Sequence, residues 1–525
     1  MVDTSCDPML QQFKKGIEEF ALEFVENSKY HKNYPTGPKI IHDPLWGTIK
    51  LDPWEVALLD LPLFQRLRQI HQTSLVSYVF PGCSHTRFEH TLGVIQQAQK
   101  LIDAVNKQYL TSDQKFSPDS IRNIRLAAIF HDCGHSCFSH ISEDLYVSCP
   151  DMNAFCQSEE FNQCHPHEAL SSLILKSQTV RKYIAELQNH YHIEFDIDKA
   201  ADSIIANFSN IQKNNHYEIQ VINGPFDADK LDYIFRDAHY SGIPVGLDLD
   251  RLWASCKVSE TESGEHVLTL HQASVAPLEQ ILFSKINLFS IVYQHPKVRA
   301  AEKMFQAVVE EAKAKDDTIY FNVSGRKLNL NRSTDYLWLT DEAFFAEALH
   351  RKQEDDLHKK LHNIRYRRFL VRALTISNDT IDNDCSDGFL QLRKLNQKGP
   401  ETYNARRNVA REIIEAAGLQ GKIDDGDVWV DFPADPSFGE ADRTFVRTAA
   451  DSLRPLSVIF PVHYWTEMYR NYKWRGHVFC SQQHQQKIHE AALEVFKDKY
   501  QVRFKKSAGE TSHVEKPKST AIKGN

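Results

Sequence analysis

The apolar stretch 127–140 carries residue types that bind metal ions and move protons. It contains an adjacent pair, His131 and Asp132, and two further histidines follow at His135 and His140. Neutral imidazole and carboxylate suit divalent transition metals such as Fe, Mn, Zn, Co or Ni. A carboxylate inside an apolar run also needs a partner for its charge, and a bound cation supplies one. The stretch therefore predicts a metal site with acid/base groups beside it.

Two further motifs bear on this interpretation, because a lone His-Asp pair also fits a surface pair or a helix cap. Upstream, Arg87 and His90 lie three residues apart and so share one face of a predicted helix. Downstream, Asp229 lies in the acidic segment 226–239. A guanidinium beside a metal ligand suits a phosphate group next to the metal. The three motifs together favour the metal site.

The order of these motifs, a His, then His-Asp, then a distant Asp, resembles the HD-domain metal-dependent phosphohydrolases. The flanking residues look like the dNTP triphosphohydrolases, in the branch that holds the vertebrate SAM-and-HD-domain dNTPase and its bacterial relatives. The likeness covers about residues 38 to 310, and we expect no SAM-type domain ahead of it. It implies a helical bundle whose metal ligands are His90, His131, Asp132 and Asp229. The implied reaction converts dNTP and water to deoxynucleoside and triphosphate, with Mg²⁺ or Mn²⁺ on the substrate phosphates.

The resemblance also implies catalytic roles around the metal. It makes His140 the general acid that protonates the leaving oxygen after attack at the α-phosphorus, and it places the carboxylate of Glu143 beside it. A histidine that donates a proton at neutral pH needs a nearby carboxylate to hold its pKa up. Three residues separate this pair, so both side chains can meet on one helix. The catalytic set expected from the resemblance is His135, His140, Glu143 and His167.

Residues that match the family's substrate-binding positions are spread along the same region. Gln72 and Asp237 match contacts to the sugar 3′-hydroxyl, and the pair Tyr293 and Gln294 matches residues placed against the base and sugar. The complete substrate-binding set implied by the resemblance is Gln72, Arg87, Lys230, Tyr233, Asp237, Lys285, Tyr293 and Gln294.

The sequence departs from the vertebrate enzyme at three of the family's positions. Thr73 stands in place of a Leu against the sugar, which bears on exclusion of the ribose 2′-hydroxyl. Lys285 stands in place of an Arg and can still neutralise a phosphate as a point charge. Phe289 stands in place of a phosphate-contacting His and cannot take that role.

A further group matches the nucleotide-sensing site of the resembled enzyme. There Asp60, Gln65 and Arg68 correspond to residues that read a guanine base, and Lys39 to one that contacts its phosphates. A carboxylate can accept the guanine N1 and N2 protons, while Arg and Gln can serve its O6 and N7. A structural interpretation is also open, in which Asp60 caps the helix that Pro62 opens and the other side chains are solvated. The resemblance implies a GTP or dNTP activator and a homo-oligomer, either dimer or tetramer.

The composition describes a slightly acidic protein that we expect to be soluble, intracellular and cytoplasmic. Its 525 residues carry a formal net charge of -8, so any nucleic-acid site must be a local patch. Ten cysteines without a CxxC pair favour reduced thiols. Cys133 and Cys137 fit either small buried packing residues, which we favour, or metal ligands. No apolar run approaches the roughly 20 residues that span a bilayer, so no membrane partner is expected.

We predict a mainly α fold, an HD-domain helical bundle with a C-terminal α+β accessory region. The tail is rich in Lys, Ser and Gly with few apolar residues, so it is predicted to be disordered. The predicted divisions are an N-terminal helical extension at 1–37, the HD-type domain at 38–310, the accessory or oligomerisation region at 311–504 and the disordered tail at 505–525.

Local patterns predict individual elements. Apolar residues every three to four positions predict an amphipathic helix over 9–29, and two short apolar pieces around Pro44 and Gly47 predict a β-hairpin over 39–51. The cluster 365–372 interleaves arginines with aromatics, which fits either contact with nucleotide phosphate or RNA, or a packed helix with paired arginines. Other predicted helices cover 54–71, 341–350, 353–371 and 405–417, and extended pieces that form a small mixed sheet include 318–323 and 428–433.

Two alternatives to the dNTPase reading stay open. Other HD enzymes use the same ligands on different nucleotides or on nucleic-acid ends, so the metal motif cannot choose the substrate. A nucleotide- or RNA-binding module with a vestigial site is the non-enzymatic alternative. Intact ligands argue against that alternative, because buried His and Asp without a cation would destabilise the fold.

Overall fold

The computed structural model is mainly helical, as predicted, and the chain divides into two compact units. The first unit contains Met1–Leu288, Val309–His358 and Ser437–Val462, and the second contains Phe289–Val308, Lys359–Pro436 and His463–Asn525. Neither unit is continuous in sequence, and both contain residues from either side of residue 310. The predicted boundary between the HD-type domain and the accessory region therefore stays a prediction. The structure describes residues 7–26, 34–108, 115–158, 161, 164–209, 211–246, 248–314, 321–323, 325–350, 356–397 and 400–514.

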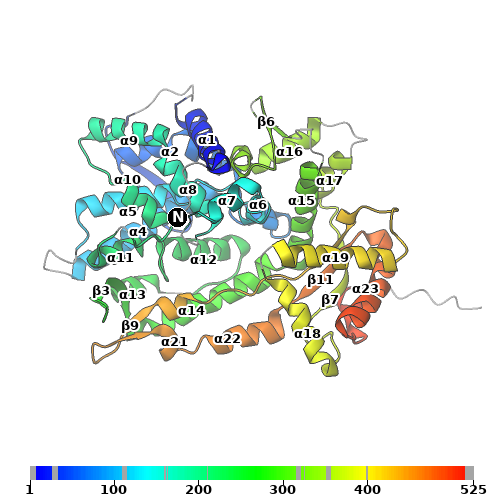
Figure 1. Cartoon of the computed structure of the whole chain (residues 1–525). Coiled ribbons are helices and arrows are strands. Elements are labelled where there is room, and N and C mark those ends of the chain that lie inside the picture. Colours follow the sequence, from blue (N-terminus) through cyan, green and yellow to red (C-terminus); the bar gives the residue numbers. More distant parts are fainter. Residues whose placement is uncertain are drawn as a thin grey trace, which may run out of the picture. The chain divides into compact units, whose positions relative to one another are not determined.

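Three adjacent helices form the centre of the first unit, with α4 (Arg87–Gln108) packed between α5 (Pro118–Phe130) and α12 (Ala228–Ser241) (Figure 1). The start of α5 is set by Ser117, whose hydroxyl accepts the Ser120 N–H at 3.0 Å. The start of α12 is set by Asp227, whose carboxylate accepts the Lys230 N–H at 2.7 Å. These caps fix where each helix begins, and therefore which side chains reach the centre of the unit.

Other helices cover this centre, and α8 and α10 pack directly on α5. The predicted helix over 9–29 is observed as α1 followed by a π-helical turn at Leu22–Glu26, with residues 27–29 outside the described residues. The remaining α-helices of the first unit are α1 (Pro8–Ala21), α2 (Pro53–Leu59), α3 (Pro62–Gln65), α6 (His140–Tyr146), α7 (Pro150–Cys156), α8 (Pro166–Lys176), α9 (Gln178–Tyr191), α10 (Ile197–Ile204), α11 (His216–Ile219), α13 (Leu249–Ala254), α14 (Val275–Asn287), α16 (Asp341–His350), α20 (Glu440–Arg443) and α21 (Leu456–Ile459).

The region before α4 forms the predicted hairpin but not one continuous helix. Strands β1 (Lys39–Asp43) and β2 (Gly47–Leu51) pair antiparallel, which confirms the hairpin. The helix predicted over 54–71 is divided into α2, α3 and a 3-10 segment at Arg66–Gln69. The break follows from Pro62, which starts a new helix because it lacks an N–H for the preceding one.

The first unit also holds a mixed four-stranded sheet in the order β10-β9-β4-β3. Its one parallel pair joins β4 (His266–His271) to β9 (Phe445–Arg447), and β3 (Cys256–Glu260) and β10 (Leu453–Pro455) pair antiparallel at the two edges. A separate hairpin pairs β5 (Phe321–Val323) with β6 (Arg326–Leu328). Segment 437–462 thus lies in the same unit as the metal motifs, although it is far from them in sequence.

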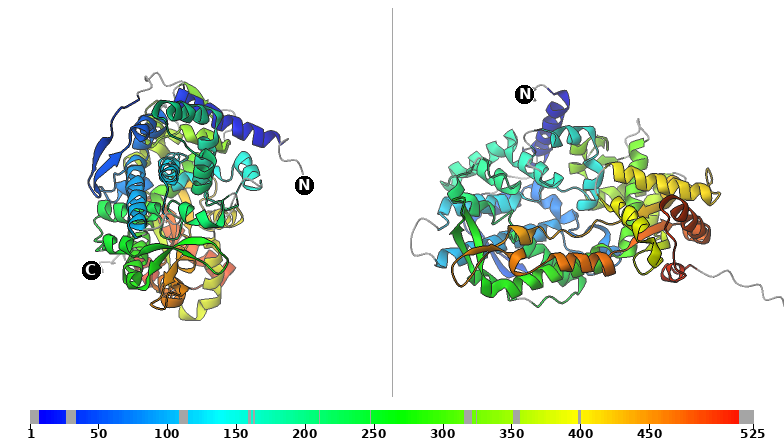
Figure 2. Two further views of the ribbon diagram at one scale, coloured as in Figure 1. Left: turned by 90° about the vertical axis from the view of Figure 1, so that its left-hand side faces the viewer. Right: turned by 60° about the horizontal axis from the view of Figure 1, so that its bottom comes forward.

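The second unit is built on a three-stranded antiparallel sheet, β7 (Val371–Ile376), β11 (Gly476–Cys480) and β8 (Val428–Asp431), in the order β7-β11-β8. Helices α19 (Pro400–Ala416) and α23 (Gln485–Tyr500) lie side by side, drawn in yellow and red in the right-hand view of Figure 2. Its core includes Trp429 and Phe479, with Phe369 packed against them. The other helices are α15 (Pro296–Ala314) and α17 (Asp356–Arg365), which each run across the boundary between the units, and α18 (Ser386–Arg393), α22 (His463–Met468) and α24 (Ser507–Thr511).

Several predictions for the C-terminal half are corrected. The helix predicted over 353–371 is α17, followed by the first residue of β7, because the chain turns at Arg367 with a φ of 58°. The three-stranded sheet β7-β11-β8 is antiparallel, whereas β9 and β10 of the same sequence region belong to the mixed four-stranded sheet. The tail is not disordered throughout: α24 lies inside it, and Ala508 and Ser512 are buried. The last residues, 515–525, lie outside the described residues.

One helical segment, Gln272–Tyr293, is long and apolar enough by length and composition to cross a membrane, with mean hydropathy 1.3. This differs from the expectation that no apolar run approaches that length. Half of the segment is buried inside the protein, and the core helix of a soluble protein has the same length and composition. The segment includes α14, whose buried residues Leu278, Ile281 and Leu282 pack in the first unit.

Candidate metal centre and active site

The four predicted metal ligands come from three helices of the first unit. His90 stands in the first turn of α4, His131 is the C-cap of α5 with Asp132 next to it, and Asp229 stands in the first turn of α12. One ligand atom each of His90, His131 and Asp132 lies within 4.8 Å of the other two. Asp229 joins them, with its Oδ1 3.0 Å from His90 Nε2. Four residues that are distant in sequence thus lie close together in the fold.

Both imidazoles are oriented so that their Nε2 atoms face this point. His90 Nδ1 lies 2.7 Å from Asp232 Oδ2, and His131 Nδ1 donates to the Ala128 carbonyl at 2.8 Å. The two Nε2 atoms are 3.3 Å apart. When Nδ1 carries the proton, Nε2 presents a lone pair, which is how proteins orient histidine ligands towards a metal.

Asp232 is a candidate functional residue that the sequence interpretation missed. It is fully buried in α12, and the guanidinium of Arg236 binds both of its oxygens at 2.8 and 3.0 Å. Trp46 also donates to it. A Cβ at Gly93 would lie 1.8 Å from its Oδ1, so only glycine admits this carboxylate next to α4. The sequence signal that could have found it is its position three residues after Asp229.

The chemistry of this donor set fits a divalent transition metal. Burial works against a charged Asp132, but Arg87 and the nearby histidines outweigh it and hold its pKa well below the usual range. Burial lowers the pKa of His131 and keeps its imidazole neutral. A buried carboxylate and imidazoles with fixed tautomers suit Fe, Mn, Zn, Co or Ni. Burial opposes the charge of His90, but Asp229 and Asp232 outweigh it and raise the pKa of His90 to about 10, so a cation would displace a proton there. His90, His131, Asp132 and Asp229 would therefore hold the cation.

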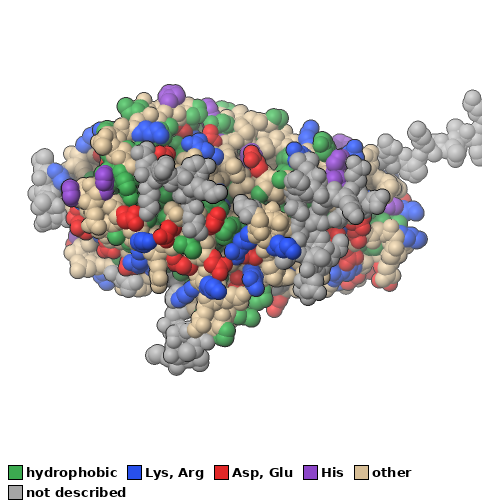
Figure 3. All heavy atoms as spheres, turned by 90° about the horizontal axis from the view of Figure 1, so that it is seen from above, with side chains coloured by type: hydrophobic (Ala, Val, Ile, Leu, Met, Phe, Trp, Pro, Cys, Tyr) green, Lys and Arg blue, Asp and Glu red, His purple; other side chains and the backbone are tan. Residues whose placement is uncertain are grey.

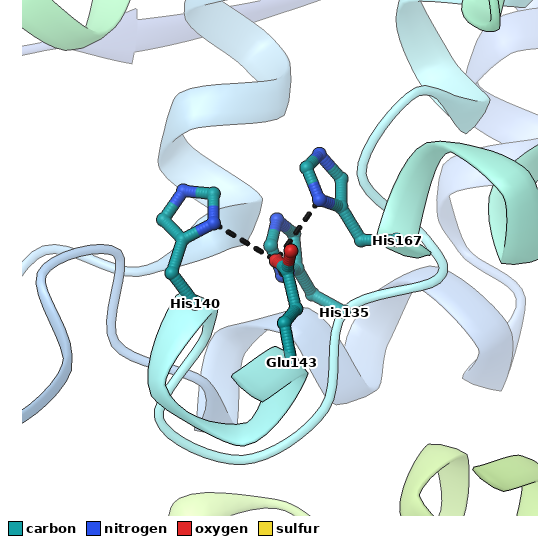
Figure 4. A group of neighbouring side chains, drawn as sticks. All are labelled: His135, His140, Glu143 and His167. Atoms are coloured by element: carbon teal, nitrogen blue, oxygen red, sulfur yellow. Dashed lines mark hydrogen bonds and ion pairs between the residues drawn. The ribbon is translucent and has the colours of Figure 1, made fainter. Parts of the chain in front are cut away.

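Beside the ligands, the four predicted catalytic residues form one cluster around the carboxylate of Glu143 (Figure 4). Its Oε1 lies 2.8 Å from His140 Nδ1, 2.9 Å from His167 Nδ1 and 3.4 Å from His135 Nδ1. Burial opposes the charge of Glu143, but His167 and His140 outweigh it and hold its pKa well below the usual range. The side chain of His140 is 64% exposed, whereas those of the other three residues are buried.

The backbone before His140 is held in an uncommon conformation. Phe138 and Ser139 have φ values of 54° and 53°, in the left-handed region that non-glycine residues rarely adopt. Three hydrogen bonds hold it: Phe138 N–H donates to Asp341 Oδ1 at 2.6 Å, Ser139 Oγ donates to the His71 carbonyl, and Arg87 donates to Ser139 Oγ at 3.0 Å. Strain of this kind persists when surrounding contacts require it. Here it sets where α6 begins and so where His140 points.

Three of the predicted substrate-binding residues, Gln72, Arg87 and Asp237, are buried in the first unit. Arg87 Nη1 donates to Asp132 Oδ2 at 2.7 Å, and its Nη2 lies 3.5 Å from the Gln72 carbonyl. The side-chain Oε1 of Gln72 is buried without a hydrogen-bond partner among the described residues. Asp237 Oδ1 lies 2.7 Å from His85 Nε2.

The lysines of the set are already engaged. Lys230 Nζ donates to Asp227 and to the Gly224 carbonyl at 2.9 Å. Lys285 Nζ donates to Glu440 Oε1 at 2.6 Å and to the Ser437 carbonyl at 2.7 Å. A phosphate bound by Lys285 would therefore have to compete with a carboxylate that the sequence analysis did not consider.

The other predicted substrate residues belong to different units. Tyr233 lies on α12 in the first unit, where burial raises its pKa well above the usual value. Tyr293 and Gln294 belong to the second unit. There Gln294 Nε2 donates to the Ala434 carbonyl at 2.9 Å and its Oε1 accepts from Tyr469. Their predicted contact with substrate stays a prediction.

The predicted sensing residues lie away from the metal motifs in sequence, and Lys39 and Asp60 are exposed. Gln65 Nε2 donates to the Leu59 carbonyl at 2.8 Å, and Arg68 Nε donates to Gln65 Oε1 at 2.9 Å. Asp60 does not cap α3, whose N-cap is Leu61, so the capping interpretation is wrong. The Asp60 side chain therefore does not serve as the N-cap of α3, and its sensing role stays a prediction.

Cys133 and Cys137 are packing residues, as favoured. Both are fully buried, and burial raises the pKa of Cys133 to about 12. A thiol that resists ionisation is a poor metal ligand, because the thiolate is the ligating form.

Two histidines and two aspartates thus lie close together, with Asp232 orienting His90 and the Ala128 carbonyl orienting His131. This arrangement fits a metal centre of the His-Asp type. Residues 87–233 match the HD domain, and residues 247–506 match the HD associated region. The chain therefore belongs to the HD-domain family, with the associated region following the HD domain. The observed helical core is the bundle that the motif order led us to expect.

Some curated relatives have a named activity, and others are uncharacterized. The chain is similar to the deoxynucleoside triphosphate triphosphohydrolase SAMHD1 of Xenopus laevis, 26% identical over 390 residues, covering 68% of this chain and 59% of that protein. The human protein of the same name is 27% identical over 343 residues, covering 63% and 54%. The uncharacterized protein YwfO of Bacillus subtilis is 27% identical over 382 residues, covering 69% and 78%. The chain thus spans little more than half the length of the vertebrate relatives it matches.

Proposed function

We propose that this protein is a metal-dependent hydrolase that converts dNTP and water to deoxynucleoside and triphosphate. Membership of the HD family and the His-Asp centre support the coarser class, a metal-binding phosphohydrolase. The finer substrate assignment is supported by the similarity to proteins named as dNTP triphosphohydrolases. It is also supported by Gln72 and Asp237, which are buried in the same unit as the centre.

The observation that carries the reaction is the exposed His140 beside buried metal ligands. Glu143 accepts from its Nδ1 at 2.8 Å, so Nε2 is left to face solvent and substrate. A histidine held in this way can give a proton to a leaving oxygen as general acid. A bound divalent cation would supply charge neutralisation and a nucleophile from water at the phosphorus. Arg87, already beside Asp132, is placed to neutralise a phosphate oxygen.

Product analysis tests this assignment. Incubation of the purified protein with each dNTP and Mn²⁺ should release inorganic triphosphate and deoxynucleoside in equal amounts, because cleavage at the α-phosphorus leaves the phosphate chain intact. Anion-exchange chromatography would measure both products. The Asp229→Ala variant, purified in the same way, controls for contaminating phosphatases. Release of diphosphate or monophosphate alone would contradict the reaction and favour the alternative of an HD phosphohydrolase with another nucleotide substrate.

The sensing group supports a second part of the proposal, activation by a nucleotide other than the substrate. Asp60 presents an exposed carboxylate that does not cap α3, and Gln65 and Arg68, a few residues later, are hydrogen-bonded to each other. This combination can read a guanine edge. A nucleotide that binds only an assembled homo-oligomer stabilises that assembly in proportion to its differential affinity. A coupling of about 1 to 3 kcal/mol is typical and changes affinity roughly 5- to 150-fold.

A matrix of substrates and additives tests activation. Each dNTP serves as substrate against GTP and each dNTP as additive, with mass measured in parallel by light scattering. Asp60→Ala is expected to abolish activation and leave basal hydrolysis unchanged, because this side chain is outside the metal centre. Glu262→Ala, another exposed carboxylate of the first unit, is the matched control. Equal rates with every additive, at unchanged mass, would refute the sensing role.

A further inference from the structure

The buried carboxylate of Asp341 binds two loops of the first unit that carry proposed functional residues. Its Oδ2 accepts the His71 N–H at 2.9 Å and lies 2.7 Å from His71 Nδ1, and its Oδ1 accepts the Phe138 N–H at 2.6 Å. His71 directly precedes Gln72, and Phe138 lies two residues before His140. Asp341 is the first residue of α16 and is distant from both loops in sequence.

The two loops also bind each other. Ser74 Oγ donates to the Phe138 carbonyl at 2.5 Å, and Ser139 Oγ donates to the His71 carbonyl at 2.7 Å. Ser74 has a φ of 58°, so it shares the left-handed conformation of Phe138 and Ser139. Such backbone persists where surrounding contacts require it. The carbonyls of the loops thus bond loop to loop, whereas the N–H groups of His71 and Phe138 both bond to Asp341.

Packing and charge both support the position of this carboxylate. On the same helix as Asp341, the rings of Phe344 and Phe345 contact the ring of Phe138 edge-on, with centroids 5.3 and 5.5 Å apart. The hydrogen bond to Asp341 raises the pKa of His71, against the burial that lowers it. The carboxylate therefore acts on His71 through its charge as well as through its geometry.

We propose that Asp341 is a positioning residue for the reaction, and that it holds the loop of His140 in register with the loop of Gln72. This inference rests on the proposed function, in which His140 donates the proton and Gln72 contacts the sugar. The register matters because a displacement of about 1 Å can cost roughly 10²-fold in rate. Asp341 acts through the two loops, so its replacement should affect the reaction by as much as it moves them.

Asp341→Asn tests this contact with almost no change in volume. One carboxylate oxygen becomes an NH₂ group, which then faces the N–H of either His71 or Phe138 and cannot accept from it. Glu342→Gln is the matched control, because Glu342 is an exposed carboxylate in the same turn of α16. Basic and acidic side chains are interspersed on the face drawn in Figure 3, and single exposed charges contribute little.

Hydrogen exchange, measured by mass spectrometry on the full-length protein, follows the loops without any turnover. Asp341→Asn should speed exchange in segments 71–76 and 136–142 and leave that of α5 unchanged, and Glu342→Gln should match the natural protein. Unchanged exchange in both loops, or an equal increase that includes α5, would overturn the proposal. This readout does not depend on hydrolysis, so a failure of the dNTPase assignment is distinguishable.

Steady-state kinetics then show whether Asp341 acts through His140. Asp341→Asn should lower kcat with dNTP by about 10- to 100-fold. In a His140→Ala background the same change should cost no more than about 2-fold, because residues that act through one another are not additive. A nitrophenyl triphosphate, whose phenolate leaves without a proton, should be cleaved by Asp341→Asn at nearly the natural rate. Equal losses in both backgrounds would overturn the proposal.

Discussion

Asp132→Ala is expected to lose bound metal and hydrolytic activity together. This carboxylate is buried, ionised and within 3.6 Å of the Nε2 atoms of His90 and His131, so it supplies both charge and geometry to the cation. Loss of a catalytic metal removes several kcal/mol of transition-state stabilisation, which corresponds to a rate decrease of about 10³-fold or more. Metal content by elemental analysis and triphosphate release from dNTP would be measured on the same preparation.

The control for this variant must separate loss of metal from loss of fold. Removing Asp132 leaves Arg87 buried without its partner, which can cost about 3–5 kcal/mol. Asp132→Asn keeps the volume and one acceptor for that guanidinium, so it should fold while still losing the metal. Asp335→Ala removes an equally buried carboxylate of the same unit, bonded to Arg326 and the Asn329 N–H, and should keep metal and activity. A folded Asp132→Asn protein with full metal content would contradict the ligand assignment.

His140→Ala is expected to keep the metal and to lose about 10²- to 10⁴-fold in rate, the usual range for removal of a general acid. The reason is positional: its side chain is exposed, its Nδ1 is bonded to Glu143, and Nε2 is left for the leaving oxygen. The limb of the pH–rate profile that reports the acid should disappear with it. Steady-state kinetics across pH and metal content by elemental analysis would be measured together.

Further measurements would distinguish a general-acid role of His140 from a role as a metal ligand. His190→Ala, an exposed histidine on α9 of the same unit, is the matched control and should change neither rate nor metal content. A substrate with a leaving group that needs no proton should be cleaved by His140→Ala at nearly the natural rate. If His140→Ala instead empties the metal site, then this histidine is a ligand and the acid must be sought elsewhere in the cluster.

Local sequence patterns were sufficient to predict those contacts of the site that form within one helix or at its end. The adjacency of His131 and Asp132 at the end of an apolar run, and the three-residue spacing of His140 and Glu143, correspond to side chains that meet in the structure. The hairpin over 39–51 and helix α16 were predicted with their observed bounds or nearly so. Patterns of this kind succeed because periodicity and capping act over a few residues.

Long-range packing decided the rest, because spacing along the chain carries no information about which distant carboxylate meets which histidine. Asp232 reaches His90 only because α12 packs on α4 at Gly93, and Glu440 reaches Lys285 from a segment 155 residues later. Sequence alone therefore determined the ligand types, the motif order and the helical class. Tertiary structure decided which carboxylates orient the histidines, which lysine is already paired, and that Asp341 binds both His71 and Phe138.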